Sequence, residues 1–168
     1  MAGRGMCDCD DPTHADQGHR CRADGDLNDV ETFKREDDAL NVRQRILDVY
    51  SKEGFDSIAP NDLNGRFRWM GLYTQRKPGL DGTHTGEDDI GDSRFMMRVR
   101  TDGGKLTTAQ VRVIGGISRD FALGSADVTN RQNVQLHNVQ IEDVPTIRER
   151  LDAVGLITTE ACGDCPAG

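Results

Sequence analysis

The chain has 168 residues, which is enough for one domain with a hydrophobic core and too few to suggest two full-sized domains. Its 21 Lys and Arg residues against 29 Asp and Glu residues give a net charge of -8, which argues against non-specific binding to nucleic acid or anionic lipid. No apolar run approaches the roughly 20 residues of a membrane span, and the N-terminus has no charged start followed by an apolar stretch. We therefore expect a cytoplasmic protein that binds neither nucleic acid nor membrane.

Residues 1–38 are rich in acidic residues and glycine and contain almost no large apolar side chains, so this composition predicts a flexible acidic tail. The five cysteines of the chain are split between its two ends, which does not resemble the disulfide framework of a secreted domain. The cysteines and histidines of the tail fit the spacing of none of the common zinc modules, whereas the CxxC pair near the other end would be half a zinc site or a redox pair. These residues are Cys7, Cys9, His14, His19, Cys21, Cys162 and Cys165. A small zinc or thiol-redox protein nevertheless stays open as an alternative.

Residues 39–93 are expected to contain a helix, a mixed segment and a long loop. Helical spacing relates four apolar side chains, namely Val42, Ile46, Val49 and Tyr50, and Gly54 is placed to end this helix in a left-handed cap. Residues 64–76 mix aromatic side chains with arginines in a way that no single period explains. Residues 77–92 form a polar, glycine-rich stretch that is long enough for a functional loop.

The signals become regular from residue 94. Residues 94–100 alternate like a strand, with apolar side chains on one face and Arg98 and Arg100 on the other. Thr107 and Gln110 form a capping box that predicts a helix ending near Gly124. Two glycines inside this helix, at residues 115–116, would each destabilise it by roughly 1 kcal/mol relative to alanine, so we expect them to approach the sheet or a bound group closely.

The remaining elements complete the order βαββαβ. Two short strands are expected near 125–129 and 133–141, the second changing phase where Val139 takes over as an apolar position. A helix over 143–155 and a last strand over 156–161 follow. This order is the split βαβ, ferredoxin-like arrangement of the α+β class, with helices on one face of an antiparallel sheet.

The uncovered sheet face should carry the functional side chains, because helices cover only the other face. Alternation places on it, beside Arg98 and Arg100, the side chains of Arg131, Asn133, Gln135 and His137. A basic patch on an acidic protein predicts an anionic ligand. The alternative is a solvated face whose arginines pair with nearby acids. An RNA-binding sheet would need aromatic residues on this face, whereas Phe95 is expected on the core side.

Several motifs in consistent order resemble the ferredoxin-dependent nitrite and sulfite reductase family. They span residues 42–166 and are "GRFRWMGLYTQR", "FMMRVRTDGGKLT", "ADVTNRQNVQLHNVQIEDVP" and "RLDAVGLITTEACGDC". The resemblance implies the N-terminal part of an assimilatory enzyme that reduces nitrite to ammonia or sulfite to sulfide in six-electron steps, with electrons from ferredoxin. It also implies siroheme coupled to a [4Fe-4S] cluster.

The resemblance further implies roles for individual residues. Arg98 would help to bind the anionic substrate and is the expected catalytic residue. The expected siroheme-contacting residues are Tyr73, Gln75, Arg98, Arg131, Asn133, Gln135 and His137. No residue of this chain is expected to ligate the metal, because the cluster cysteines lie downstream in the family. Cys162 and Cys165 precede that motif, and two thiols cannot complete a four-thiolate site.

The expected domain organisation is an acidic tail (1–38), a helical and aromatic/Arg-rich part with a loop (39–93), a reductase ferredoxin-like half-domain (94–161) and a truncated CGDCP motif (162–168). We expect an incomplete enzyme that is inactive without its missing C-terminal half. A non-catalytic ferredoxin-like module that binds an anion or a tetrapyrrole is the other alternative. Nitrite and sulfite are not distinguished at this point.

Overall fold

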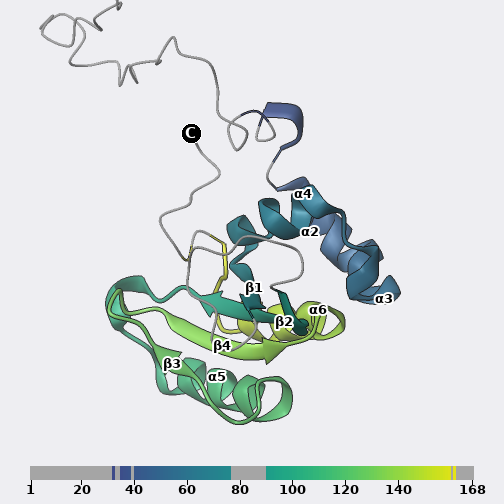
Figure 1. The fold of residues 1–168 in the computed structure, drawn as a ribbon. Helices are drawn as coiled ribbons and strands as arrows, with labels where there is room; N and C mark the ends of the chain where they lie inside the picture. Colours follow the sequence, from purple (N-terminus) through teal and green to yellow (C-terminus); the bar gives the residue numbers. More distant parts are fainter. Residues whose placement is uncertain (1–31, 33–34, 39, 77–89, 160, 162–168) are drawn as a thin grey trace, which may run out of the picture.

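The computed structural model describes residues 32, 35–38, 40–76, 90–159 and 161 (Figure 1). Most of the expected acidic tail, most of the expected loop and all of the cysteines lie outside the described residues. The end of the predicted tail is described, and Asp37 there lies 2.8 Å from Arg45. Within the described part, no helix is long and apolar enough to cross a membrane.

The predicted first helix is present and is interrupted by a π-helical turn. It consists of α2 (Asn41–Arg45), η2 (Ile46–Tyr50) and α3 (Ser51–Glu53). Three of its predicted apolar positions are buried, but Val49 is 36% exposed, because the wider π-helical turn rotates it away from the core. Gly54 has φ +86° with an extended ψ of 179°, so the predicted left-handed cap is wrong: the chain turns directly into the next helical turn.

Short helical turns then lead the chain to the sheet. They are η3 (Phe55–Ser57), α4 (Pro60–Asn64) and η4 (Arg66–Met70). Within η4 the side chains of Phe67, Trp69 and Met70 are fully or almost fully buried. The mixed aromatic and arginine segment therefore has no single period because a 3₁₀ helix passes into a strand within it.

The sheet has four antiparallel strands, in the order β1-β2-β4-β3 (Figure 1). They are β1 (Leu72–Arg76), β2 (Ile90–Val99), β3 (Asp127–Val128) and β4 (Val134–Val139). Strand β2 begins four residues before the predicted start at Arg94. Its alternation is as predicted, since Phe95, Met97 and Val99 are all 0% exposed.

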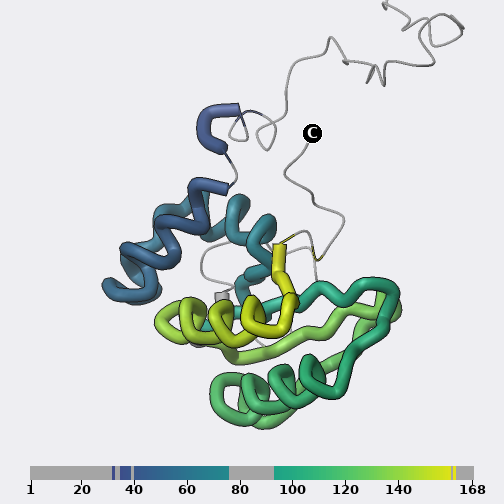
Figure 2. Tube along the Cα trace, turned by 180° about the vertical axis from the view of Figure 1, so that it is seen from behind, coloured from purple at the N-terminus to yellow at the C-terminus, as the bar shows by residue number. Residues whose placement is uncertain are grey.

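Two longer helices cover one face of this sheet, as predicted (Figures 1 and 2). They are α5 (Thr108–Phe121) and α6 (Val144–Asp152), preceded by the short turns η6 (Asp102–Gly104) and η7 (Ile141–Asp143). The Thr107–Gln110 capping box at the start of α5 is confirmed. The two glycines of α5 do not approach the sheet closely, because no atom beyond the neighbouring helix backbone lies within 4 Å of a Cβ built at either position. Their approach to a bound group stays a prediction.

The predicted last strand is reduced to one bridge, between Ile157 and Arg100. Strand β1 pairs with β2 along the same edge, and the two segments meet at Gly71. A Cβ at Gly71 would lie 2.4 Å from the carbonyl oxygen of Thr158 and 2.8 Å from that of Arg98, so only glycine fits there. The strand over 156–161 is therefore wrong in extent, because β1 occupies most of that edge.

Candidate functional site

The candidate site is the sheet face opposite α5 and α6, called here the open face. Its described side chains are half-buried and come from three strands. They are Tyr73 and Gln75 on β1, Arg94, Met96 and Arg98 on β2, and Gln135 and His137 on β4. The strand alternation turns these side chains away from the core, so the open face is polar and largely basic.

Tyr73, Arg98 and Gln135 form a row across the open face. The Arg98 guanidinium lies over the Tyr73 ring, with Cζ 4.9 Å from the ring centroid, and Gln135 is the register partner of Arg98 on β4. The Nε of Arg98 is buried without a hydrogen bond. Among the described residues, no carboxylate lies within ion-pair distance of Arg98. The row therefore presents a fixed, un-neutralised positive charge, which suits an anionic ligand.

His137 lies beside this row and has an acidic neighbour on the edge strand β3. Its Nε2 is 3.0 Å from Oδ2 of Asp127, but the two groups do not have the angles of a hydrogen bond. The Asp127 side chain is 69% exposed. The contact is an ion pair only when the imidazole is protonated.

The predicted phase change of β4 is confirmed and takes the form of a β-bulge. Between the pairs Met97–Leu136 and Phe95–Val139, β2 contributes one residue and β4 contributes two, His137 and Asn138. Asn138 has φ +62°. An asparagine at the phase change is the sequence signal for this geometry, since Asn tolerates positive φ better than most residues.

Side chains of two other strands hold the backbone of Asn138. Its N–H donates to Oε1 of Gln75 over 2.7 Å, and its carbonyl oxygen accepts from an Nη of Arg94 over 3.3 Å. Gln75, a predicted siroheme contact, therefore uses its amide oxygen within the sheet. Sequence reasoning gave Arg94 no role, because the contact joins residues 44 positions apart.

Arg131 and Asn133 do not join the row on the open face. Arg131 is exposed in the turn between β3 and β4, because Gln132 has φ +67° and breaks the predicted alternation before the strand begins. Its predicted place on the strand is therefore wrong. The Asn133 amide donates to the carbonyl oxygen of Ala161 over 2.7 Å and accepts from the N–H of Thr101 over 3.3 Å. Asn133 thus ties together three backbone segments.

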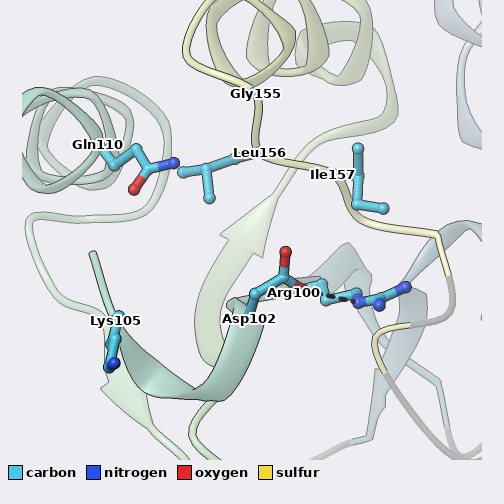
Figure 3. Close-up of a pocket in the computed structure, with 7 residues that line it drawn as sticks. All are labelled: Arg100, Asp102, Lys105, Gln110, Gly155, Leu156 and Ile157. Atoms are coloured by element: carbon cyan, nitrogen blue, oxygen red, sulfur yellow. Dashed lines mark ion pairs between the residues drawn. The ribbon is translucent and has the colours of Figure 1, made fainter. Parts of the chain in front are cut away.

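Arg100 is also separated from Arg98. Its Nε lies 3.4 Å from Oδ1 of Asp102, as the alternative of arginines paired with nearby acids predicts. Arg100 lines a pocket of about 170 Å³ at the start of α5 (Figure 3). The other lining residues are Asp102, Lys105, Gln110, Gly155, Leu156 and Ile157. Since Lys105 points away from Arg100 in Figure 3, the two cations do not converge on one ligand position.

A second polar cluster, the Asp62 cluster (Asp62, Arg45, Arg66 and Tyr50), is buried among the N-terminal helices. The Asp62 carboxylate is 1% exposed and accepts hydrogen bonds from Arg45 (2.6 and 2.9 Å), Arg66 (2.9 Å) and the Tyr50 hydroxyl (2.7 Å). Burial alone would raise the pKa of Asp62, but these hydrogen bonds hold it below its usual range. No sequence motif indicated this cluster. Outside the cluster, the carboxylate of Asp37 lies 2.8 Å from Arg45 and 3.8 Å from Arg66, so the two arginines are balanced by two acids and the cluster is structural.

A metal centre is not formed by the part of the chain that the structure describes. No group of three or more His, Cys, Asp and Glu side chains there could hold a metal ion. The cysteines of the zinc or thiol-redox alternative lie outside that part.

Comparison with known proteins identifies the fold and its relatives. Residues 89–154 match the family described as "Nitrite/Sulfite reductase ferredoxin-like half domain". "Sulfite reductase [ferredoxin] 1" of Mycolicibacterium paratuberculosis is 57% identical over 145 residues, covering 84% of this chain and 26% of the relative. "Ferredoxin--nitrite reductase" of Leptolyngbya laminosa is 30% identical over 140 residues, covering 83% of this chain and 25% of the relative.

A solved structure agrees with these sequence relatives. The structure of the Mycobacterium tuberculosis NirA protein is 55% identical in sequence with a TM-score of 0.76, and the match covers 84% of this chain and 26% of that chain. The predicted α+β, ferredoxin-like fold is confirmed. This chain spans about a quarter of the length of the relatives it matches.

Proposed function

This chain belongs to the nitrite and sulfite reductase family, and we propose that its open face is the siroheme-contacting and substrate-contacting surface of an assimilatory enzyme. The complete enzyme would be cytoplasmic and would reduce nitrite to ammonia or sulfite to sulfide with six electrons from ferredoxin. The observation that carries the proposal is the half-buried Arg98 guanidinium, which stacks on Tyr73 and has no described carboxylate beside it.

The chemistry of the open face fits siroheme, a macrocycle that carries several carboxylates. Tyr73, Arg98, Gln135 and His137 would hold it, since they supply an aromatic ring, a guanidinium, an amide and an imidazole from three adjacent strands. Charge-assisted hydrogen bonds to carboxylates are about twice as strong as neutral ones. When bound, siroheme with its coupled [4Fe-4S] cluster supplies the electrons that break N–O or S–O bonds.

Arg98 is the proposed catalytic residue. A guanidinium stays protonated throughout the working pH range, so Arg98 binds the substrate anion and stabilises negative charge without itself donating a proton. The Tyr73 ring restricts the guanidinium on one side, so less side-chain entropy is lost when an anion binds. Arg131, in the turn between β3 and β4, would add positive charge at the periphery of the siroheme-contacting surface.

The remaining parts of the reductase would complete the site. In the proposed organisation, residues 94–161 form the ferredoxin-like half-domain, and the family match over 89–154 supports it. The missing C-terminal half would supply the cluster cysteines and enclose the cofactor. We accordingly expect no nitrite or sulfite reduction by the 168-residue chain alone.

The test is a titration of the purified chain with iron-loaded siroheme, followed by visible absorption. We expect saturable binding that Arg98→Met weakens at least tenfold and Arg131→Ala weakens less. Arg112→Ala is the matched control, because it removes one positive charge from an exposed position on α5. Circular dichroism establishes that each variant is folded.

Two results would overturn the proposal. One is a folded wild-type chain without saturable siroheme binding. The other is an Arg98→Met variant that binds siroheme as tightly as Arg112→Ala does, since the removed charge would then contribute no more than any surface arginine.

A further inference from the structure

Side chains from β1 and β2 both hydrogen-bond to the backbone of the bulge in β4. This arrangement has a role separate from that of Tyr73, Arg98 and Gln135. We infer that Gln75 and Arg94 are positioning residues that lock the backbone of Asn138 and thereby set His137 on the open face. Gln75, Arg94 and Asn138 are together called here the Asn138 clamp. Its consequence for siroheme binding rests on the proposed function, whereas the clamp itself is a property of the chain alone.

The Asn138 backbone needs such partners. A residue in a bulge leaves the regular ladder of strand hydrogen bonds, and an unpaired backbone N–H or C=O away from water is unfavourable. Asn138 also holds a positive φ, which residues other than glycine adopt at a cost, although Asn tolerates it better than most. Gln75 accepts from the N–H at 2.7 Å and Arg94 donates to the carbonyl at 3.3 Å, so both backbone groups are satisfied by side chains.

The bulge decides which way His137 and its neighbours point. Leu136 and Val139 are both 0% exposed although they are three positions apart, which regular alternation does not allow. The extra residue places both His137 and Asn138 outside the core. If the clamp were released and β4 returned to regular alternation, Asn138 would turn into the core and Val139 would turn out. The clamp therefore fixes the strand segment that carries His137.

The direction of the hydrogen bond gives Gln75 a role that differs from direct cofactor binding. Because Asn138 N–H is a donor, the Gln75 oxygen must be the atom that faces it. A clamp requires only this acceptor. A direct contact to siroheme carboxylates would instead require the NH₂ donor of Gln75. Gln75→Glu keeps an acceptor oxygen and removes the NH₂ group, so hydrogen exchange at Asn138 in this variant tests the acceptor role alone.

The first measurement is amide hydrogen exchange by NMR on the isotope-labelled chain without cofactor. We expect Asn138 to exchange at least tenfold faster in Gln75→Met than in wild type and to stay protected in Gln75→Glu. Arg94→Met should also accelerate this exchange, and Arg94→Lys should restore part of the protection. Gln140→Met is the matched control, because Gln140 is an exposed glutamine two residues from Asn138. Unchanged Asn138 exchange in Gln75→Met would overturn the inference.

The second measurement is the titration of the same variants with iron-loaded siroheme. Gln140→Met should bind within about twofold of wild type, and Gln75→Met should bind three- to tenfold more weakly. Binding by Gln75→Met that is as tight as that of Gln140→Met, despite faster Asn138 exchange, would overturn the positioning role. If no variant and no wild-type chain binds siroheme, the proposed function fails, and the exchange measurement still decides whether the clamp exists.

Discussion

The Asp62 cluster and the open face both place arginines beside an aromatic side chain, but they differ in how the positive charge is compensated. In the Asp62 cluster two guanidiniums and a phenol satisfy one carboxylate that is 1% exposed. On the open face, the Arg98 guanidinium lies over the Tyr73 ring and the side chain stays half-buried. A neutralised, buried cluster stabilises the fold, whereas a partly desolvated cation without an acid retains the capacity to bind an anion.

The arginines on and beside the sheet also differ in whether their charge is already paired. Arg100 has an acidic neighbour and Arg131 extends from a turn into solvent. Arg94 is occupied by the backbone of Asn138. Arg98 therefore remains the candidate ligand-binding cation of β2, and charge count alone would not have separated it from the others.

The largest expected effect comes from removing the centre of the Asp62 cluster. Asp62→Ala removes the buried acceptor of the Tyr50 hydroxyl and leaves Arg45 and Arg66 beside the partly exposed Asp37, so the free energy of unfolding should fall by about 3–5 kcal/mol. Urea denaturation measures this change. Asp56→Ala, at an exposed acid of η3, is the matched control and should stay within about 0.5 kcal/mol of wild type. A loss below about 1 kcal/mol for Asp62→Ala would show that the cluster contributes little.

Acid should act on the same cluster. The pKa of Asp62 is lowered in the folded chain by hydrogen bonds from Arg45, Tyr50 and Arg66, which outweigh burial, so the unfolded chain binds the proton more readily. The stabilisation is present above about pH 4, the ordinary range of an aspartate, and is lost as pH falls through the lower folded value. The free energy of unfolding between pH 5 and pH 3 should therefore decrease more steeply in wild type than in Asp62→Asn. Parallel curves would contradict this assignment.

Arg148 on α6 is intermediate between the Asp62 cluster and Arg98, because it is buried but has no paired acid among the described residues. It is 9% exposed, its guanidinium approaches Met70 Sδ at 3.7 Å and Thr158 Oγ1 at 3.5 Å, and burial lowers its pKa. Within the described ranges no carboxylate pairs with it. Arg148→Met should thus be neutral or raise the free energy of unfolding by about 1 kcal/mol, measured by urea denaturation. A loss above about 2 kcal/mol would reveal an anionic partner.

Arg98 should show the smallest effect on stability. Because it is half-buried and neutralises no described acid, Arg98→Met should change the free energy of unfolding by less than about 0.5 kcal/mol. The same variant is expected to weaken siroheme binding at least tenfold. Thermal denaturation of the chain without cofactor measures the first value. A large loss of stability would place Arg98 with the structural arginines and remove the contrast with the Asp62 cluster.

Local patterns predicted a large part of the fold. The alternation of β2, the Thr107–Gln110 capping box and the phase change of β4 each depend on residues within one turn or strand, and all three are confirmed. The edge position of β1 was not predicted, because it depends on pairing with a strand beyond a long loop.

The site was less predictable for the same reason. Alternation correctly placed Arg98, Gln135 and His137 away from the core. It failed at Arg131, since the positive φ of Gln132 precedes the strand and carries no clear sequence signal. The Gln75–Asn138 contact joins residues 63 positions apart, and the Asp62–Arg45 contact joins residues 17 positions apart. Helical and strand periodicity relate only residues that are close in sequence, so they predict neither contact.

The junction at Gly71 has a mechanical consequence. Arg98 N–H donates to the Gly71 carbonyl over 2.8 Å, and Arg100 N–H donates to the Ile157 carbonyl over the same distance, so two segments lie end to end along β2 with their seam beside Arg98. Thr158 and Gly71 touch through their backbones there. A displacement of the chain beyond Thr158 would strain this seam first. A movement that separated the backbones of Gly71 and Thr158 would therefore act directly on the strand that carries Arg98, the proposed catalytic residue.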